Sequence, residues 1–268
     1  MSRPGRLPAL ILLPVLVVAG LVVQTGQDDE APDEVRLADM TPTAAAPDTL
    51  SSTWYCAAGS ATGVREGEGA GPAEHQVILS NHSDAASTVR VAIIPDEGEQ
   101  KVVNVPVEPH SRRSVTLSDT VTAPWASALV EASGGEVSVA HQLQGPNGRS
   151  ISDCASAPSS SWYFPGGTTA VGADMWLALF NPFPGDATVD VSFATDEGAR
   201  TPQDYQGIVV PSRRVVVRKV SEGGVVSLKE NVSTTVSVRS GRIIAEMVQS
   251  ESGREDDGVR IPKGLTAT

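Results

Sequence analysis

The sequence predicts an all-β protein built from two tandem antiparallel β-sandwiches of about 100 residues each. Three observations carry this prediction. One series of sequence landmarks occurs twice along the chain, and apolar and polar residues alternate between the landmarks, as they do in strands with one buried face. After residue 30, no segment sustains the 3.6-residue apolar period of a helix.

The duplication begins with residues 54–59 (WYCAAG), which residues 162–167 (WYFPGG) repeat about 108 positions later. Each copy continues to a Leu-x-Asn triplet, at 79–81 and at 179–181. The spacing drifts further along, because loops change length more readily than strands. A solenoid or propeller needs shorter or more numerous repeats, so the sequence favours two look-alike domains.

Strict alternation follows each triplet. Val89, Val91 and Ile93 share one face of an expected strand, and Val189, Val191 and Phe193 share the corresponding face in the second copy. Seven or so short strands per copy, punctuated by Gly, Pro, Asn and Asp, are typical of an immunoglobulin-like sandwich. We expect the cores to consist mainly of Val, Ile, Leu and Ala, since aromatic residues make up only 4% of the chain.

An Asp-Glu-Gly triplet closes each of these strands, at 96–98 and at 196–198. Paired carboxylates are what a glycosidase uses, which makes hydrolysis one hypothesis for the chain. Asp and Gly are also favoured in hairpin turns for backbone reasons, and recurrence in both copies favours the turn.

Two arginine pairs are the most conspicuous polar feature. Residues 109–113 (PHSRR) align with 211–214 (PSRR) if one residue is inserted in the first copy. Neighbouring side chains on a strand point to opposite faces, so one arginine of each pair should be exposed and able to bind an anionic polymer. The favoured alternative is an arginine whose stem packs over the sheet and whose head pairs with a local carboxylate. These candidates for ligand contact are Arg112, Arg113, Arg213 and Arg214.

Trp54 and Trp162 open the two copies and are further candidates, since aromatic faces stack on sugars. Their recurrence favours the alternative that each ring packs in a sandwich core. Trp125 and Trp176 lack counterparts in the other copy, and we expect Trp176 to be a core residue.

Catalytic and metal-binding patterns are weak. The four histidines all fall in the first copy, and their spacing does not resemble a metal pair, so we expect them to be scattered over the surface. No Gly-x-Ser-x-Gly elbow is present in the sequence. We therefore predict no catalytic residues, no metal site and no cofactor. The histidines are His75, His82, His110 and His141.

Two cysteines, Cys56 and Cys154, predict one disulfide, because an even count in an exported chain is typical of a structural bond. Cys56 occupies the position that Phe164 fills in the second copy, and Cys154 follows the last strand of the first copy. The bond would tie the end of that domain to its beginning. Metal or redox chemistry is the disfavoured alternative.

The N-terminus resembles an export signal. Arg3 and Arg6 precede an apolar run over 7–23, and acidic residues follow it, which orients the rest of the chain outward. The run is just long enough to cross a bilayer, and no Ala-x-Ala cleavage site follows, so an uncleaved anchor is favoured over a cleaved signal. The acidic, Pro- and Ala-rich residues after it read as a flexible spacer.

These observations give an expected division of the chain. The net charge of −12 argues against a nucleic-acid partner, because phosphate binding needs clustered Lys and Arg. The expected segments are a transmembrane anchor over 1–23, a disordered linker over 24–52, a first sandwich over 53–145, a linker over 146–161, a second sandwich over 162–250 and a disordered tail over 251–268.

Three stretches of the second copy resemble a known family, at 162–167 (WYFPGG), 176–182 (WLALFNP) and 187–193 (ATVDVSF). The similarity is to exported, membrane-anchored actinobacterial proteins of unknown function, which share their repeat with immunoglobulin-like "WYFAEG"-type surface modules. It extends over 161–249 and more weakly over 53–144, where CAA replaces FPG. The resemblance implies a non-enzymatic, envelope-facing module and assigns no binding residues.

Together these features predict a scaffold or protein-interaction module, held at the cell membrane by a single pass with its domains outside, or secreted if the leader is cleaved. The expected partners are the membrane and an envelope protein or cell-wall polymer. The alternative function is binding of a cell-wall polymer or carbohydrate through the tryptophans or arginines. A hydrolase is the third and least favoured class.

Overall fold

The structure is a computed structural model, and it describes residues 44–63, 72–146, 148–222, 224–252, 258–262 and 264–266. All of them belong to one compact unit, Pro42–Thr268. The expected anchor over 1–23 and residues 24–43 of the expected spacer over 24–52 lie outside the described residues. Within the described ranges, no helix is long and apolar enough to cross a membrane.

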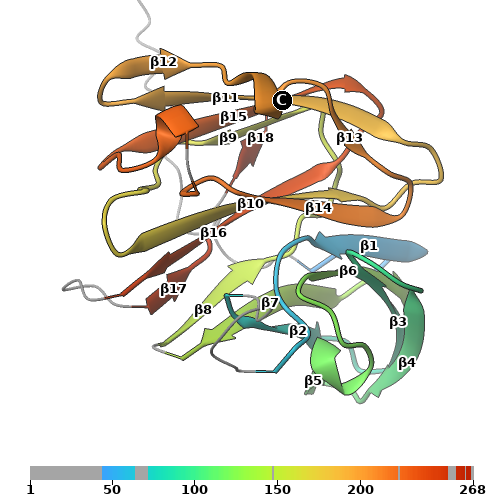
Figure 1. Ribbon diagram of the computed structural model, residues 1–268. Coiled ribbons are helices and arrows are strands. Elements are labelled where there is room, and N and C mark those ends of the chain that lie inside the picture. The colour runs from blue at the N-terminus through green and yellow to red at the C-terminus, as the bar shows by residue number, and fades with distance from the viewer. Residues whose placement is uncertain are drawn as a thin grey trace, which may run out of the picture. The chain divides into compact units, whose positions relative to one another are not determined.

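The first half of the unit forms two four-stranded sheets, and every strand pair in them is antiparallel (Figure 1). One sheet runs in the order β1 (Ser51–Cys56), β6 (Ala126–Ser133), β3 (Ser87–Pro95) and β4 (Lys101–Val107). The other runs in the order β5 (Arg112–Thr116), β2 (Glu74–Asn81), β7 (Val137–Gly145) and β8 (Gly148–Asp153). A short 3-10 helix, η2 (Leu117–Asp119), follows β5.

The second half forms a six-stranded and a four-stranded sheet, again antiparallel. The larger sheet runs in the order β12 (Gly198–Arg200), β11 (Ala187–Thr195), β15 (Val232–Ser240), β9 (Ser161–Phe164) and β18 (Leu265–Thr266), with β13 (Ile208–Val210) also on β11. The smaller runs in the order β14 (Arg214–Lys219), β10 (Ala173–Asn181), β16 (Ile244–Glu251) and β17 (Gly258–Arg260). The 3-10 helices η3 (Gln203–Tyr205) and η4 (Gly224–Val226) lie in loops. The prediction of an all-β, antiparallel protein is confirmed.

The strand order of the first half recurs in the second. β1-β6-β3-β4 corresponds to β9-β15-β11-β12, and β5-β2-β7-β8 corresponds to β14-β10-β16-β17. The pairing register agrees with the sequence landmarks: Trp54 lies opposite Val130, and Trp162 lies opposite Val236 at the matching point of its own sheet. The two copies seen in the sequence therefore have one connectivity.

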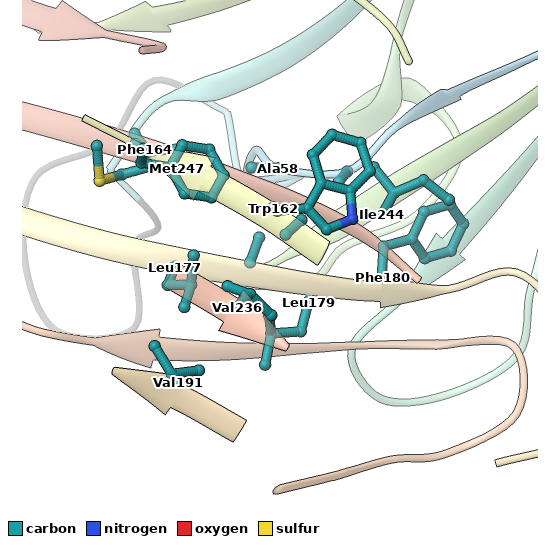
Figure 2. Packing of buried hydrophobic residues seen from close by; sticks show 14 of the residues in the cluster. Ala58, Trp162, Phe164, Leu177, Leu179, Phe180, Val191, Val236, Ile244 and Met247 are labelled. Carbon is teal, nitrogen blue, oxygen red and sulfur yellow. The ribbon is translucent and has the colours of Figure 1, made fainter. Parts of the chain in front are cut away.

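Each half has a buried apolar cluster between its two sheets. The first contains Trp54, Val77, Val91 and Val130, so it draws on both sheets of the first half. Figure 2 shows the second cluster, where Trp162, Leu177, Val191 and Val236 lie between the two sheets of the second half. This cluster continues into the first half. The first-half residues that join it are Ala57, Ala58, Ala73, Ile94 and Leu143.

Strand β10 explains how the two halves share apolar surface. Its residues from Leu177 to Phe180 are all fully buried, although neighbouring side chains point to opposite faces. Leu177 faces the core of its own half, while Trp176 on the other face contacts Trp125 of the first half. A strand covered on both faces needs a continuous apolar run, which is why WLALF does not alternate.

Two segments differ from the expected division. The tail expected to be disordered over 251–268 contains β17 and β18, and the expected linker over 146–161 contains β8. β8 extends its sheet beside β7 as β17 does beside β16, so the backbone groups of both are paired. Val259 and Ile261 are buried and hold the tail against the second core. These short strands are too polar to show an apolar alternation.

Candidate functional site

The predicted disulfide between Cys56 and Cys154 is confirmed, with a Cα–Cα distance of 4.6 Å. Cys56 ends β1 opposite Ala128 on β6, and Phe164 ends β9 opposite Thr234 on β15, so the two residues hold equivalent positions. The bond fixes the start of the segment that runs from Ala57 to Gly59, which contacts the second half.

Trp54 and Trp162 are each only 5% exposed and therefore cannot stack on a polymer. The indole Nε1 of Trp162 donates a hydrogen bond to the Ile243 carbonyl at 3.1 Å, which satisfies its polar edge inside the core. The structure supports the core alternative for both and removes them as ligand contacts. Tyr163, the neighbour of Trp162 on β9, lies on the opposite face of the strand and is exposed.

Trp125 and Trp176, which lack counterparts between copies, are partners of each other. Their ring centroids lie 6.2 Å apart, and the Lys219 Nζ lies 5.5 Å from the Trp176 ring centroid. Trp176 is partly buried at the junction between the halves, rather than in the core of one sandwich as expected. A junction residue belongs to one copy only, which explains the missing counterpart.

The arginine pairs do not occupy equivalent positions. Arg112 lies opposite Ser80, whereas Arg214 lies opposite Asn181, the residue that matches Asn81. The register instead aligns His110 with Arg213, and both adopt the left-handed conformation, with φ of 48° and 51°. The alignment of the two pairs was wrong by two positions, because the left-handed corner and not the arginine run sets the register. Arg112, Arg113 and Arg213 are exposed, and Arg214 is half-buried.

The two Asp-Glu-Gly triplets lie in turns. Gly98 and Gly198 have φ of 90° and 105°, which favours glycine and agrees with the turn interpretation. Glu197 forms an ion pair with Lys229 at 2.6 Å, which lowers the pKa of its carboxyl below the usual range. Through this ion pair Glu197 stabilises a turn on the surface.

The histidines divide into two groups. His82 and His110 are exposed as expected, and they contact Ser138 and Asp84 respectively. His75 and His141 are fully buried, so the expectation of a surface position was wrong for them. Their ring centroids lie 5.1 Å apart in an edge-to-face arrangement.

His75 and His141 form a buried chain of contacts with Glu246. The His75 Nδ1 lies 2.8 Å from the Ala126 carbonyl oxygen, and the His141 Nδ1 lies 3.1 Å from the His75 Nε2. The His141 Nε2 then lies 2.8 Å from the Glu246 Oε1, off the line of a hydrogen bond. His75 is on β2, His141 on β7 and Glu246 on β16, so the chain crosses from the first half to the second.

Backbone donors bind the other oxygen of Glu246. The amides of Ala57 and Ala58 donate to its Oε2 at 2.9 and 3.1 Å. The Ser127 hydroxyl donates to the Ala57 carbonyl and holds the segment in place. Two successive N–H groups that converge on one oxygen make an anion-binding concavity, here closed over a carboxylate of the other half.

The protonation of the histidines follows from these contacts. A carbonyl oxygen only accepts, so the His75 Nδ1 carries a hydrogen and its Nε2 accepts from the His141 Nδ1. Burial, followed by the neighbouring His141, lowers the pKa of His75 to about 3, while its bond to Ala126 opposes the shift. His75 is therefore a neutral imidazole at ordinary pH.

The sequence held a signal for this network that the spacing argument missed. His75 lies two residues before Val77, and His141 lies two residues after Val139, so both continue the inward-facing alternation of their strands. Within the described part of the chain, no group of three or more His, Cys, Asp or Glu residues is placed to hold a metal ion. Since neither imidazole is exposed, the network has no access to a substrate.

Comparisons with known proteins add little about function. No curated protein matches the chain. A crystal structure of Thermotoga maritima 1070 is similar at 13% identity with a TM-score of 0.32, covering 40% of this chain and 94% of that one. A second, of a "putative secreted protein" from Parabacteroides distasonis ATCC 8503, is similar at 9% identity with a TM-score of 0.20, covering 83% of this chain and 96% of that one. Residues 141–259, from His141 to the buried Val259, match the model of a family of unknown function (DUF5719).

Proposed function

We propose that the chain is a non-enzymatic protein-interaction module of a cell envelope. In this proposal the N-terminal apolar segment anchors the chain in the membrane, and two tandem immunoglobulin-like sandwiches that follow it in the sequence lie outside. The disulfide supports an oxidising compartment, because cytosolic reductants keep thiols reduced. The observation that carries the interaction role is an apolar surface on two adjacent loops of the second half.

This surface, here called the loop patch, consists of Val171, Val225 and Leu228. Their exposed fractions are 80%, 54% and 69%. The first follows β9, and the other two lie in and beside η4, between β14 and β15. Loops at the ends of a sandwich are a common place for binding residues, and grouped apolar side chains in water mark an interaction site.

Thr169 holds the two loops together. It is buried, and its hydroxyl donates to the Val226 carbonyl and accepts from the Lys229 amide at 3.1 Å. Its carbonyl accepts from the Leu228 amide at 3.0 Å, and its own amide donates to the Lys229 carbonyl at 2.9 Å. The loop patch is thus arranged before a partner arrives, which lowers the entropy cost of binding.

Leu228 gives a second reason to assign the loop patch a role. Its φ of 58° is left-handed, a conformation that is costly for a residue with a branched side chain. The bond from its amide to Thr169 maintains that conformation and leaves the side chain exposed. Strain that presents an apolar group to solvent supports a binding role.

The test is crosslinking in intact cells followed by recovery of the chain, with a photoreactive residue in place of Val225. We expect one envelope protein to be crosslinked, and Leu228→Glu to reduce its recovery at least about tenfold. Val209, on β13, has the same 54% exposure as Val225, so Val209→Glu is the matched control and should leave recovery unchanged. Equal recovery with all variants would contradict the proposal.

Binding of a cell-wall polymer is the alternative outcome of this experiment. In that case the chain would sediment with purified cell wall, and changing exposed arginines such as Arg113 would release it. No protein would then be crosslinked at Val225.

A further inference from the structure

We propose that the edge of β9 is a binding site for an extended segment of a partner protein, which takes the place of the chain's own residues 264–266. The required chemistry is a glycine followed by an aliphatic residue in a β-strand conformation. This site goes beyond the interaction role proposed above, and it does not depend on the loop patch.

The first half closes the free edge of its first strand covalently. Tyr55 on β1 exchanges backbone hydrogen bonds with Ala155, at 2.8 and 2.9 Å. The neighbouring residues, Cys56 and Cys154, form the disulfide. Because the returning segment cannot leave this edge while the disulfide is intact, the edge of β1 is not available to another strand at this point.

The second half closes the matching edge without a covalent bond. Tyr163, which corresponds to Tyr55, lies opposite Leu265 of β18 (Figure 1). Phe164 and Gly264 therefore occupy the positions of the two cysteines. A Cβ at Gly264 would lie 2.7 Å from the Phe164 Cε1, so the glycine backbone lies close to the ring. The disulfide of one copy is thus replaced in the other by a contact between a glycine and an aromatic ring.

Few contacts hold β18 in place. It pairs with β9 through two residues, Leu265 and Thr266, whereas β15 on the other side of β9 pairs through four. Leu265 is 55% exposed and Thr266 is also exposed, so neither buries much apolar surface. Local opening is easiest where few contacts oppose it, so β18 can leave the edge while β9 stays paired with β15.

The rings beneath β18 determine the chemistry of the partner. Phe164 and Trp162 are buried, and Gly264 lies against both of them. A side chain at that position would meet Phe164, so the partner strand needs a glycine there. The next residue lies beside Tyr163, which is 41% exposed, and an aliphatic side chain there covers its ring. Backbone pairing with β9 supplies the remaining affinity, as in other complexes that extend a sheet.

A second copy of this chain is the disfavoured occupant. Val259 and Ile261, which precede β18, are buried and belong to the second core. Ile261 and Gly264 are three positions apart, a reach of about 11 Å at most. A second copy could place its glycine on this edge only by approaching that closely or by withdrawing both buried side chains. A separate protein has neither restriction.

The test uses the full chain and a fluorescent peptide with the sequence of residues 261–268 (IPKGLTAT). In the unaltered chain the peptide competes with a tethered copy of itself, whose effective concentration is on the order of millimolar. Gly264→Val expels that copy, because the new side chain meets the Phe164 ring. We expect fluorescence anisotropy to show binding at least about tenfold tighter to Gly264→Val than to the unaltered chain. Equal affinity for the two proteins, or no binding to either, would overturn the proposal.

Gly166→Val is the matched control, because Gly166 lies two residues beyond the same strand and a Cβ there would meet nothing within 4 Å. It should bind the peptide as weakly as the unaltered chain does. A peptide with valine in place of its glycine should not bind Gly264→Val, and equal binding of the two peptides would contradict the required contact with Phe164. Leu228→Glu, added to Gly264→Val, should leave peptide binding unchanged, which separates this site from the loop patch.

Sedimentation of Gly264→Val without peptide distinguishes the two occupants. A partner protein as the occupant predicts a monomer. A dimer that the peptide dissociates would assign the edge to a second copy, and it would overturn the choice of a partner protein.

A measurement on the unaltered chain keeps the proposal testable if Gly264→Val fails to fold. A peptide with a photoreactive residue in place of its leucine should crosslink to Tyr163 when it is added at millimolar concentration, about that of the tethered copy. Crosslinks only to other parts of the chain, or none at all, would overturn the proposal.

Discussion

Asn81 and Asn181 make the same contacts in the two halves of the chain. The Asn81 amide donates to the carbonyls of Ala85 and Val107 at 2.8 and 3.1 Å, and the Asn181 amide donates to those of Gly185 and Val210 at 2.8 and 3.0 Å. Each side-chain oxygen accepts from the amide two residues later. Both asparagines are buried, so each closes the turn between consecutive strands from inside.

Because the two asparagines make equivalent contacts, replacing either one should lower the free energy of unfolding by a similar amount. Asn81→Ala and Asn181→Ala each leave buried carbonyls without a donor, and each should lower the free energy of unfolding by about 1–3 kcal/mol. Asn104→Ala, at an exposed position of β4, is the control and should change it by less than about 0.5 kcal/mol. Denaturant titration measures all three, and a cost confined to one half would contradict the shared role.

Gly59 is predicted to be required for the position of His75. A Cβ at Gly59 would lie 2.4 Å from the His75 Cβ and Cγ, whereas one at Gly98 would meet nothing within 4 Å. Gly59→Ala should therefore destabilise the fold by about 1–3 kcal/mol more than Gly98→Ala. Both glycines have positive φ, so the comparison isolates the steric clash. Equal thermal midpoints for the two variants would show that His75 moves freely.

Acid should destabilise the chain through His75. Its folded pKa is about 3 against about 6.5 in the unfolded chain, so between these values the unfolded state binds a proton that the native state does not. The contribution of His75 to the free energy of unfolding is therefore fully present above about pH 6.5. It falls by up to about 1.4 kcal/mol per pH unit as the pH decreases toward 3.

His75→Asn tests this slope, because the Asn amide can keep the bond to the Ala126 carbonyl without titrating. Unfolding free energies measured over this range should fall less steeply in His75→Asn, by one bound proton. If both proteins show one slope, the buried imidazole is not the origin.

Reduction of the disulfide should lower stability by about 4–5 kcal/mol in the chain-entropy account. The bond closes a loop with a sequence separation of 98, and both sulfurs are buried. The double variant Cys56→Ala, Cys154→Ala should also reduce the protection of the Ala57 amide against hydrogen exchange, because the disulfide fixes Cys56, the residue before Ala57. An unchanged exchange rate at Ala57 in this double variant would show that the disulfide does not support the contact between Ala57 and the second half.

The fold could be predicted largely from the sequence. The alternating valines, the repeated Trp-Tyr and the Leu-x-Asn triplets each mark a strand or a turn through residues that are close in the sequence. Such a pattern does not depend on how the strands pack against one another. Cys56 could be paired with Cys154 because the chain holds just two cysteines. The strands β8, β17 and β18 were not predicted, because they are short. They pair through backbone hydrogen bonds, which leave no side-chain pattern in the sequence.

The junction could not be predicted, because it depends on where one half meets the other. Trp125 and Trp176 looked unpaired when each copy was compared with the other, and they contact each other across the junction. Glu246 is a charged residue within a mostly apolar strand, and its partners, His141 and the amides of Ala57 and Ala58, come from the other half of the chain. Such contacts join residues from 51 positions apart, for Trp125 and Trp176, to 189 positions apart, for Ala57 and Glu246, beyond the reach of local patterns.

Equilibrium unfolding of the full chain, followed by one probe in each half, tests the account most directly. Hydrogen exchange of amides on β3 and on β11 can report the two halves separately. If the shared apolar cluster and the His141–Glu246 pair join the halves, both probes should report one transition with one midpoint, and Glu246→Ala should split it. Two separate transitions in the unaltered chain would contradict the account.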